Sequence, residues 1–479
     1  MTKILESVHS FLWGAPALVL ILGVGIYLSI RTGFAQITLF PRAVKEFFRK
    51  LTAKAGGEGS VTPFQALCTA LAATVGTGNL VGVAGAICVG GPGAVFWIWV
   101  CGILGMATKY AEATLAVRCR ILENGEYKGG PMYMIASGLG KRWHFLAWLY
   151  SFFGVLAAFG VGNATQINAV ITGINTLTGR ESRMGNLCMG LILAVLIGAM
   201  LLGGAKRIGT VAERLVPFVS TAYILLCFGV LLIKWDALIP AFRAIVRGAF
   251  SPAAVTGGIL GSAFQALKVG CARGVFTNEA GMGTASMAHA SAAVSHPAEQ
   301  GLMGIMEVFL DTILICTLTA LVILTSGVPI PYGTDLGGEL TTAAFSAVYG
   351  DWVTAFIAGA LCCFAFATVL GWGLYGARCA EFLFGSGAWK WFALLQTVTV
   401  ILGALLNTGL IWLLAELING LMAIPNLIAL AALSPELRRL TIEYKQKIRP
   451  RAGGGTLCRF PSTQTGASPR PCGNSIPSR

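Results

Sequence analysis

Two short stretches of small and polar residues interrupt long apolar segments of the chain. Residues 72–79 read AATVGTGN, and residues 274–283 read GVFTNEAGMG. Within hydrocarbon every backbone N–H and C=O must be satisfied internally, so lipid favours an unbroken helix. A break rich in glycine, threonine and asparagine is tolerated only where it lines a protein or water cavity. One break in each half of the chain therefore predicts the binding site of an inverted-repeat secondary transporter.

Each break offers groups that bind charge. At the first, Gly76 and Gly78 permit backbone conformations that other residues resist. A helix that restarts near Asn79 presents free N–H groups and a positive dipole end, which suit a carboxylate. A helix that stops near Val75 presents free carbonyls, which suit a cation. Because the same logic applies around residues 276–281, the pattern favours a zwitterion with two close charges, namely an α-amino acid.

The glycines of the first break also have a simpler interpretation. Gly78 and Gly82 have the G-x-x-x-G spacing that lets two membrane helices pack closely. A second break at the matching position in the other half of the chain weighs against helix packing as the full explanation.

The composition indicates a membrane protein. Hydrophobic residues make up 56% of the 479 residues and charged residues 11%, with a mean hydropathy of +0.75. A soluble domain carries roughly 25% charged residues. The 13 cysteines include no C-x-x-C pair. Many of them lie inside apolar runs, which indicates small buried side chains rather than disulfides or a zinc site.

Apolar runs of about 20 residues, enough to cross a hydrocarbon core of about 30 Å, recur along the chain. Eleven spans are predicted, at residues 11–31, 64–90, 93–118, 145–173, 187–204, 213–233, 253–272, 301–326, 353–383, 390–407 and 410–431. The seventh continues as a half-helix through about 281–295. Residues 32–61 mix phenylalanines with basic side chains, which is typical of an amphipathic segment at the membrane surface.

Setting the first span aside leaves five spans before the 234–252 connection and five after it. Because five is an odd number, the two halves would have opposite topology, as in an inverted repeat. The expected fold is an all-α membrane protein of about eleven helices, with a ten-helix core arranged as a 5+5 inverted repeat. Its first and sixth core helices are the discontinuous ones.

The chain divides into a membrane domain at residues 1–435 and a basic tail at 436–479. The domain would hold an extra helix at 11–31 and two repeats, at 64–233 and 253–431. The tail is expected to be disordered and cytoplasmic, because its end is rich in Pro, Gly, Ser and Arg and nearly free of aliphatic residues. Its basic charge favours contact with anionic lipid of the bilayer, and no nucleic-acid partner is expected.

The distribution of Lys and Arg predicts the orientation in the plasma (inner) membrane. The loop 31–61 carries six basic residues, whereas the loop 327–351 carries three acidic residues and no basic one. Since short cytoplasmic loops accumulate Lys and Arg, the N-terminus is expected outside and the C-terminus in the cytoplasm. The 234–252 connection fits less well, because it is expected outside yet carries three basic residues.

The second motif, FTNEAGMG at residues 276–283 with Ala285, closely resembles the alanine/glycine:cation symporter family when taken with ATVGTGN at 73–79. This family includes the bacterial and archaeal sodium:alanine symporters. The first motif also resembles the unwound first helix of the leucine-transporter fold and is shared more widely. The resemblance covers about residues 10–435. It implies a ten-helix inverted-repeat core with one extra helix, and sodium-coupled uptake of alanine or glycine.

The resemblance also implies a set of binding residues. Those for the substrate are Thr77, Gly78, Asn79, Gln166, Phe276, Thr277, Asn278, Gly281 and Trp372. In this assignment residues 77–79 bind the carboxylate, and the carbonyls and amide of residues 276–278 receive the ammonium. Gln166 would bind the carboxylate, or else form an interhelical bond with Asn163 or Asn168. Trp372 would limit the size of the substrate side chain, or else serve in ordinary packing.

The sodium ligands implied by the resemblance are the carbonyls of Ala72, Val75 and Ala365 and the hydroxyl of Thr368. Oxygen ligands of this kind are what hard cations prefer. Some relatives of the fold carry two adjacent hydroxyl residues on this helix, whereas here Val369 follows Thr368. Sodium is the expected coupling ion, and no other cofactor is expected.

Charged residues inside membrane spans are functional candidates by default, and Glu279 and Lys268 lie in or beside the second break. Structural pairing is the alternative interpretation for such residues. No G-x-x-x-x-G-K-[ST] motif or dinucleotide fingerprint occurs, so the protein is not expected to be an enzyme. The prediction is a sodium-coupled importer of alanine or glycine working by alternating access. The alternatives are proton coupling through Glu279 or Glu307, and a transporter-like amino-acid sensor or channel.

Overall fold

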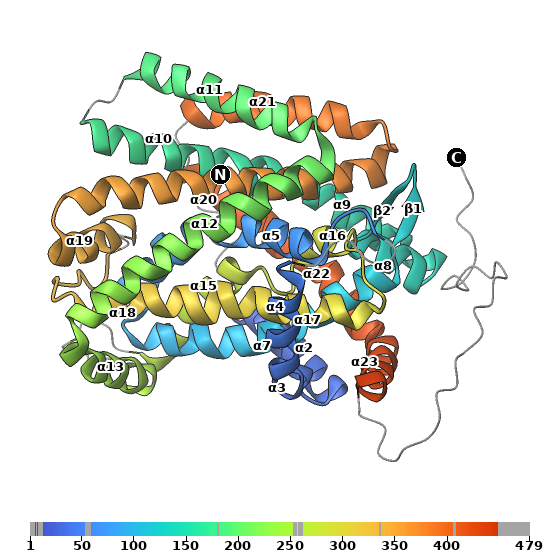
Figure 1. Ribbon diagram of the computed structural model, residues 1–479, viewed down its shortest axis with the longest axis horizontal. Coiled ribbons are helices and arrows are strands. Elements are labelled where there is room, and N and C mark those ends of the chain that lie inside the picture. The colour runs from blue at the N-terminus through green and yellow to red at the C-terminus, as the bar shows by residue number, and fades with distance from the viewer. Residues whose placement is uncertain are drawn as a thin grey trace.

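The structure is a computed structural model that describes residues 5, 7, 13–52, 59–179, 182–251, 256, 262–334, 337–405 and 409–448. This part of the chain is almost entirely helical (Figure 1). Its one sheet is a hairpin of two short antiparallel strands, β1 (Ile121–Glu123) and β2 (Glu126–Lys128). The predicted all-α class is therefore confirmed, with the hairpin as a small addition.

The helices of the first half are α2 (Ala15–Thr32), α3 (Ala35–Thr38), α4 (Phe40–Lys50), α5 (Pro63–Thr74), α6 (Val83–Gly90), α7 (Gly93–Arg118), α8 (Pro131–Gly138), α9 (His144–Phe159), α10 (Thr165–Thr178), α11 (Arg183–Leu201) and α12 (Gly204–Ile233). Those of the second half are α13 (Leu238–Phe250), α15 (Ala263–Asn278), α16 (Thr284–His289), α17 (Pro297–Val308), α18 (Thr317–Thr325), α19 (Gly337–Tyr349), α20 (Trp352–Phe384), α21 (Ala388–Leu405), α22 (Gly409–Ala432) and α23 (Ser434–Ile448). Three π-helical segments interrupt or join them, at Gly78–Gly82, Gly160–Ala164 and Phe309–Cys316.

Among the described residues, seven helices are long and apolar enough to cross a membrane, and two bent helix pairs could add two more crossings. Large apolar side chains on their outer faces are exposed, such as Phe218 and Leu232 of α12 at 74% and 75%. Exposed side chains of this kind suit contact with lipid. The eleven-span count and the repeat arrangement stay predictions, and most of residues 252–261, where the seventh span was expected to begin, lie outside the described residues.

The first break lies between α5 and α6, whose axes differ by 52°. Helix α5 starts with a reciprocal cap, in which the Thr62 hydroxyl accepts the Gln65 N–H and the Gln65 amide oxygen accepts the Thr62 N–H, both at 3.0 Å. It stops where Val75 takes an extended conformation with ψ of 103°. The helix is buried along its whole length, so its break lies within protein, as the sequence argument required.

The second break lies between α15 and α16. Glu279, Gly281 and Gly283 there have φ values of 53°, 95° and 78°. Glycine adopts this left-handed region freely, whereas glutamate rarely does. The backbone therefore turns sharply at the place where the sequence predicted a break, and Glu279 is held in an uncommon conformation.

Several segments expected to be loops contain helices that lie across the ends of the bundle. Helix α13 occupies the 234–252 connection and α19 the 327–351 loop, and both lie at the left of Figure 1. The hairpin, α8 and α23 gather at the right of the same view. The amphipathic segment predicted within 32–61 is confirmed as α4. These elements are short relative to a membrane span and therefore escape a search for long apolar runs.

The predicted start of a disordered tail at residue 436 was wrong for residues 436–448. They form most of α23, which buries Leu437, Leu440 and Tyr444 on one face. The spacing of these side chains is helical, and their burial against the bundle stabilises the helix despite the many basic residues on its outer face. The rest of the predicted tail, at 449–479, lies outside the described residues.

Candidate functional site

A cavity lies where the two breaks meet. It is lined by Ala73, Thr74, Gly76, Thr77, Gly78, Val161, Gln166, Phe276, Glu279, Thr368, Trp372 and Asn419. The space between these atoms amounts to about 340 Å³. Eleven of the twelve lining residues are buried, and Phe276 is half-buried. The structure therefore shows a small pocket in the interior of the bundle.

Six of the residues predicted to bind substrate or sodium line this cavity: Thr77, Gly78, Gln166, Phe276, Thr368 and Trp372. They come from both breaks and from α10, α15 and α20, so the fold brings together segments that are far apart in the chain. A Cβ on Gly78 would lie 3.4 Å from the Thr277 hydroxyl oxygen and 3.6 Å from the Thr277 Cα, in ordinary van der Waals contact. The two breaks thus approach one another at backbone distance.

At the first break, the side chain of Asn79 is hydrogen-bonded to other groups of the protein. Its amide oxygen accepts the Gly76 N–H at 2.9 Å, and its Nδ2 donates to Oδ1 of Asp311 at 2.8 Å. The neighbouring Thr77 hydroxyl donates instead to Oε1 of Gln166, at 3.4 Å. This contact joins the first break to α10, whereas Asn163 donates to the Gln396 carbonyl. Thr77 and Gln166 are therefore the polar groups that the first break presents to the cavity.

At the second break, Thr277 and Asn278 are also engaged away from the cavity. The Thr277 hydroxyl donates to the Arg273 carbonyl at 2.7 Å, and Oδ1 of Asn278 accepts the Ala280 N–H at 2.9 Å. Neither side chain lines the cavity, although Phe276 beside them does. The motif therefore sets the path of the backbone more than it supplies side chains to the pocket.

Gly281 belongs to the hydrogen-bonded backbone of the second break. Oε1 of Glu112 on α7 accepts the N–H groups of Gly281 and Gly283, at 2.9 and 3.0 Å. The same oxygen accepts Nδ2 of Asn426 on α22, which also donates to the Gly281 carbonyl at 2.8 Å. A side chain at Gly281 would be strained because of its positive φ. The buried carboxylate of Glu112 thus satisfies backbone donors that the broken helix leaves free.

Glu279 is the charged residue in the cavity wall. Its Oε1 accepts the indole N–H of Trp372 at 3.0 Å, and its Oε2 accepts the Thr284 hydroxyl at 2.5 Å. The side chain is 4% exposed. The sequence singled out Glu279 because it lies in the second break but did not place it beside Trp372. Its bond to Trp372 fixes the ring that forms one wall of the pocket.

The predicted sodium ligands lie beside the cavity. The Thr368 hydroxyl on α20 is 3.1 Å from the Ala72 carbonyl oxygen on α5. A Cβ on Gly76 would come within 2.9 Å of the same hydroxyl, so a glycine permits this approach. The extended conformation of Val75 turns its carbonyl out of the helical pattern, and Ala365 precedes Thr368 by about one turn of α20. The Thr368 hydroxyl and the Ala72 carbonyl thus form one close pair of oxygens, the ligand type that hard cations prefer.

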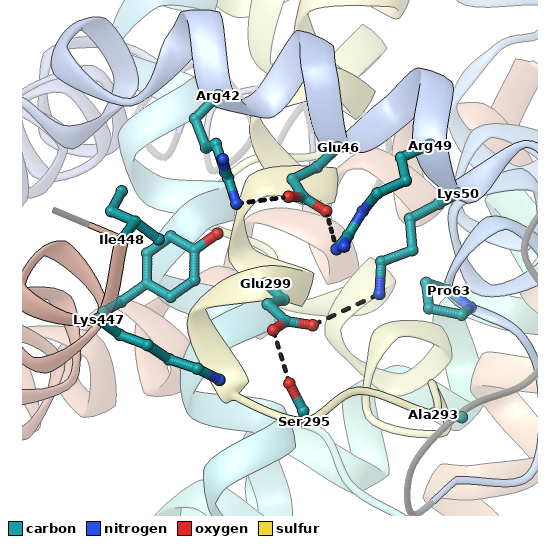
Figure 2. Close-up of a pocket in the computed structure, with 11 residues that line it drawn as sticks. Arg42, Glu46, Arg49, Lys50, Pro63, Ala293, Ser295, Glu299, Lys447 and Ile448 are labelled. Carbon is teal, nitrogen blue, oxygen red and sulfur yellow. Dashed lines mark hydrogen bonds and ion pairs between the residues drawn. The ribbon is translucent and has the colours of Figure 1, made fainter. Parts of the chain in front are cut away.

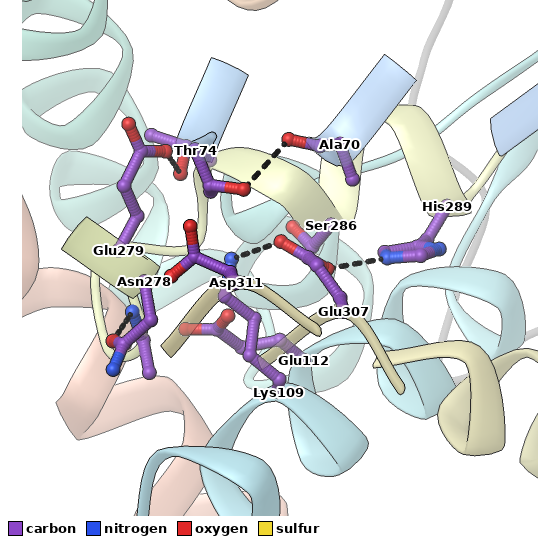
Figure 3. Close-up of polar contacts among 12 residues, drawn as sticks. Ala70, Thr74, Lys109, Glu112, Asn278, Glu279, Ser286, His289, Glu307 and Asp311 are labelled. Atoms are coloured by element: carbon purple, nitrogen blue, oxygen red, sulfur yellow. Dashed lines mark hydrogen bonds and ion pairs between the residues drawn. The ribbon is translucent and has the colours of Figure 1, made fainter. Parts of the chain in front are cut away.

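A cluster of buried charges surrounds the breaks (Figure 3). Lys109 on α7 binds Oε1 of Glu307 on α17 at 2.9 Å, and His289 binds Oε2 of the same carboxylate at 2.9 Å. Lys109 therefore pairs across helices, and Glu112, one turn along α7, holds the second break instead. Lys109 and Glu307 are each about 1% exposed. A buried ion pair of this kind fixes the relative position of the helices that carry it.

A larger groove of about 630 Å³ lies at the start of α5, between α4, α17 and α23 (Figure 2). Arg42 and Arg49 bind Glu46 on α4, and Lys50 reaches Glu299 on α17 at 3.4 Å. The first two ion pairs lie within α4, and the Lys50–Glu299 pair joins this helix to the bundle. The groove contains neither break, so it is not the site that the sequence predicted.

Six lining residues had no place in the predicted binding set: Ala73, Thr74, Gly76, Val161, Glu279 and Asn419. The first three belong to the first break and could have been found from their neighbours. Asn419 is one of two asparagines in the apolar run of α22, which is a usable signal for a polar role in a membrane span. Val161 has no sequence signal, because an apolar residue in an apolar helix points to no particular neighbour.

A helical membrane bundle whose two broken helices meet at one cavity defines a secondary transporter of the leucine-transporter-like fold. The crystal structure of MhsT in complex with L-phenylalanine shares this fold, with a TM-score of 0.52 at 15% identity, over 81% of this chain and 99% of that one. The chain belongs to the sodium:alanine symporter family, which it matches over residues 1–453. It is thus a member of a transporter family and not of an enzyme family.

Two relatives cover nearly the whole chain. An uncharacterized transporter of Haemophilus influenzae is 43% identical over 93% of this chain and 97% of its own length. The sodium/alanine symporter AgcS of Methanococcus maripaludis is also 43% identical, over 90% of this chain and 94% of its own. The expected resemblance is confirmed by the family match and by these relatives.

Proposed function

We propose that this protein is a sodium-coupled symporter that imports a small neutral amino acid, alanine or glycine, by alternating access. The observation that carries the proposal is the small cavity at the two breaks, with the Thr368 hydroxyl and the Ala72 carbonyl 3.1 Å apart beside it. The family match and the name of the AgcS relative support the same assignment.

The cavity suits a small zwitterion. Backbone at Thr77 and Gly78, with the Gln166 amide, is placed to bind the carboxylate. In this proposal the rings of Phe276 and Trp372, which line the cavity, limit the substrate side chain to a hydrogen or a methyl group. Sodium would be held by the carbonyls of Ala72, Val75 and Ala365 and the hydroxyl of Thr368. Its positive charge would stabilise the carboxylate across the thin wall formed by the first break.

The protein is a multi-pass membrane protein, and we propose the plasma membrane as its location. The N-terminus lies outside and the C-terminus in the cytoplasm in this proposal. The two broken helices are the first of each five-helix repeat, so movement of one repeat against the other would open the cavity to either side in turn.

Uptake into liposomes tests the function. Purified protein should accumulate labelled alanine or glycine when sodium is higher outside than inside, and should not accumulate it when choline replaces sodium at constant pH. Counterflow separates a carrier from a channel, because a carrier loaded with unlabelled alanine exchanges it for labelled alanine. Equal uptake in sodium and choline contradicts sodium coupling, and uptake without counterflow contradicts a carrier.

Proton coupling is the second candidate, and one observation favours it. Glu112, Glu279 and Asp311 are fully or nearly buried, yet none forms an ion pair with another side chain in the described part of the chain. A buried carboxylate without an ion-pair partner is a candidate proton carrier in a membrane transporter. If protons drive transport, an inward pH gradient alone should support uptake in sodium-free buffer. If uptake depends on the sodium gradient and is unchanged by the pH gradient, proton coupling is excluded.

A further inference from the structure

The position of Glu279 in the cavity wall is fixed by its backbone conformation and by several hydrogen bonds. Its backbone takes φ of 53°, and its N–H donates to the Val275 carbonyl at 2.8 Å as the last bond of α15. Its two carboxylate oxygens each accept one hydrogen bond, from Trp372 and from Thr284. An ionised carboxylate offers about four acceptor positions, so acceptor capacity remains after these two bonds.

This carboxylate forms no ion pair in the described part of the chain. Lys109, the cation whose charge acts on it, is itself bound to Glu307 at 2.9 Å. Charged residues at membrane depth are costly and face a functional cavity where they occur. Since Glu279 lines the cavity, a cation carried by the ligand is the natural partner for its charge.

Of the groups expected to receive the ammonium, the backbone carbonyls of residues 276–278 and the Asn278 amide, the amide oxygen already accepts the Ala280 N–H. The Thr277 hydroxyl beside it donates to the Arg273 carbonyl. In contrast, Oδ1 of Asn419 is buried in the wall of the same cavity without a donor. A buried amide oxygen without a donor is unfavourable, so a ligand that supplies the donor is favoured at this position.

The polar groups of the cavity are therefore of two kinds. Glu279 and the Asn419 oxygen can only accept, whereas the first break and the Gln166 amide offer donors. A ligand that matches both kinds has a carboxylate and an ammonium, as a free amino acid does. A 2-hydroxy acid of the same shape has the carboxylate but no positive charge to pair with Glu279.

We propose that Glu279 is the counter-ion for the ammonium of the substrate, with Asn419 as a second acceptor. The inference deepens the proposed function and rests on it. Glu279 is then the residue that makes the site select primary α-amino acids over uncharged isosteres. Its bond to Trp372 couples this charge recognition to the wall that limits side-chain size.

The test is a cycle of two ligands and two proteins. Alanine and lactate differ in the ammonium, and wild type and Glu279→Gln differ in the negative charge. Affinities come from competition with labelled alanine or from protection against heat unfolding in detergent with sodium present. Loss of a charge-assisted bond should weaken alanine binding by about tenfold or more, whereas lactate binding should change by less than about threefold.

Three further variants separate binding from positioning. Glu279→Asp keeps the charge and should retain most of the preference for alanine over lactate. Thr284→Val removes the other bond to the carboxylate and should leave that preference close to wild type. Asn419→Leu should reduce the preference by a smaller factor than Glu279→Gln. All variants are first checked for a single symmetric peak in size-exclusion chromatography and for a melting transition.

One result overturns the inference directly. If Glu279→Gln weakens alanine and lactate by the same factor, Glu279 only positions Trp372 and does not bind the ammonium. Failure of the proposed function gives a different result, because wild-type protein would then bind neither alanine nor glycine. That outcome removes the proposed substrate, and the inference with it, before any variant is measured.

Discussion

Phe276 and Trp372 set the dimensions of the cavity at the scale of single residues. Trp372 is 1% exposed, and its ring is held by the bond to Glu279 and by an edge contact with Tyr375 at 5.9 Å between ring centroids. A Cβ at Gly162 would lie 2.3 Å from the Trp372 Cβ, so the neighbouring helix presses against the other side of the ring. The ring cannot move aside without disturbing both contacts.

Trp372→Ala should broaden the substrate range toward larger amino acids and weaken alanine binding. A small apolar difference normally discriminates by only about 1–3 kcal/mol, so exclusion of large side chains depends on clash with these rings. The measurement is competition of labelled alanine binding by unlabelled leucine and phenylalanine in wild type and variant. Wild-type protein that already binds leucine as tightly as alanine contradicts the pocket described above.

Thr368→Val should raise the sodium concentration needed for half-maximal alanine binding, with little loss of fold. The change removes one oxygen beside the Ala72 carbonyl and keeps the side-chain volume. Thr325→Val is the matched control, because the Thr325 hydroxyl also donates to a carbonyl one turn back but lies on α18, away from the breaks. Sodium titrations of alanine binding that are the same for both variants would exclude Thr368 as a ligand.

The sequence predicted the parts of the site that are formed by the course of the backbone. The glycines of the first break and the change of direction after Asn278 follow from residue types that lipid would not tolerate in a continuous helix. The directions of the side chains did not follow. Asn79 and Asn278 were expected to face the substrate, but both bond to groups within their own breaks or to Asp311, because a motif does not specify which neighbour a side chain meets.

Helices α7 and α17 pack closely together at the scale of elements. A Cβ at Gly301 on α17 would lie 2.2 Å from the Thr114 hydroxyl oxygen, and a Cβ at Gly304 would lie 2.7 Å from the Lys109 carbonyl oxygen. Glycines three residues apart lie on the same face of a helix and allow two membrane helices to approach at backbone distance. The contact brings Lys109 and Glu307 together and so supports the charged cluster around the breaks.

Gly301→Ala should therefore lower the melting temperature in detergent. Overpacking a tight contact typically costs about 1–3 kcal/mol. Gly359→Ala on α20 is the matched control, because its Cβ would meet nothing within 4 Å, and alanine favours the helix. The control should melt at or above the wild-type temperature. Equal melting temperatures for the two variants would show that the α7–α17 contact is less tight than the geometry indicates.

Helix α23 is attached to the bundle by an ion-pair cluster. Glu436 accepts from Nε of Arg439 at 2.8 Å and from Nε of Arg118, at the end of α7, at 2.9 Å. The hydrogen bonds from Arg439 and then Arg118 lower the pKa of Glu436 from 4.5 to about 2. Because the folded-state pKa is lowered, this stabilisation is complete above about pH 4.5 and is lost as the pH falls toward 2.

At neutral pH, Glu436→Gln should release α23 from the bundle, as acidification is expected to do in the wild-type protein. The variant keeps the size of the side chain but removes the charge that Arg118 and Arg439 share. Trypsin should then cut faster after the basic residues of α23, with the rest of the domain still protected. Glu443→Gln is the control, since Glu443 binds Arg439 alone within the same helix. Cleavage at equal rates in both variants contradicts a role for Glu436 in docking.

Long helices were easy to predict and short ones were not. Continuous apolar runs located the ends of α7, α12 and α20 to within a few residues, apart from the first residues of α12. Helices α13 and α19 were expected as loops, because each has about a dozen residues and depends on tertiary contacts for its burial. The same reason explains α23, whose basic outer face concealed an apolar stripe.

The two ends of the bundle differ in charge at the scale of the whole molecule. One end carries α4, the β1–β2 hairpin and α23, with basic residues in all three elements, and the other carries α13, α19 and the loop after α18, with Arg243 and Arg247 of α13 as its basic residues. Lys128 in the hairpin is buried at 2% exposure and binds Glu381 at 2.8 Å, so part of this basic charge is structural. The charge asymmetry still favours the α4 end as the cytoplasmic one.

Cysteine labelling at the two ends tests this orientation, and the structure selects the positions. Asn124 is exposed at the tip of the hairpin, and Thr334 is exposed beside the end of α6, where the Gly333 N–H donates to the Cys88 carbonyl. Asp335, a charge on which the sequence argument relied, lies outside the described residues. The background needs only the exposed or half-exposed cysteines removed, namely Cys188, Cys362 and Cys363, with the two in 449–479. The other described cysteines are buried.

In intact cells, a membrane-impermeant maleimide should label Thr334→Cys and leave Asn124→Cys unlabelled until the membrane is opened. The background protein without either substitution shows the residual labelling of buried cysteines. Alanine uptake by each variant confirms that the labelled protein is folded in the membrane. The reverse pattern would place α4, the hairpin and α23 outside. Sodium and substrate would then enter from the opposite end of the broken helices, and the proposed direction of import would be wrong.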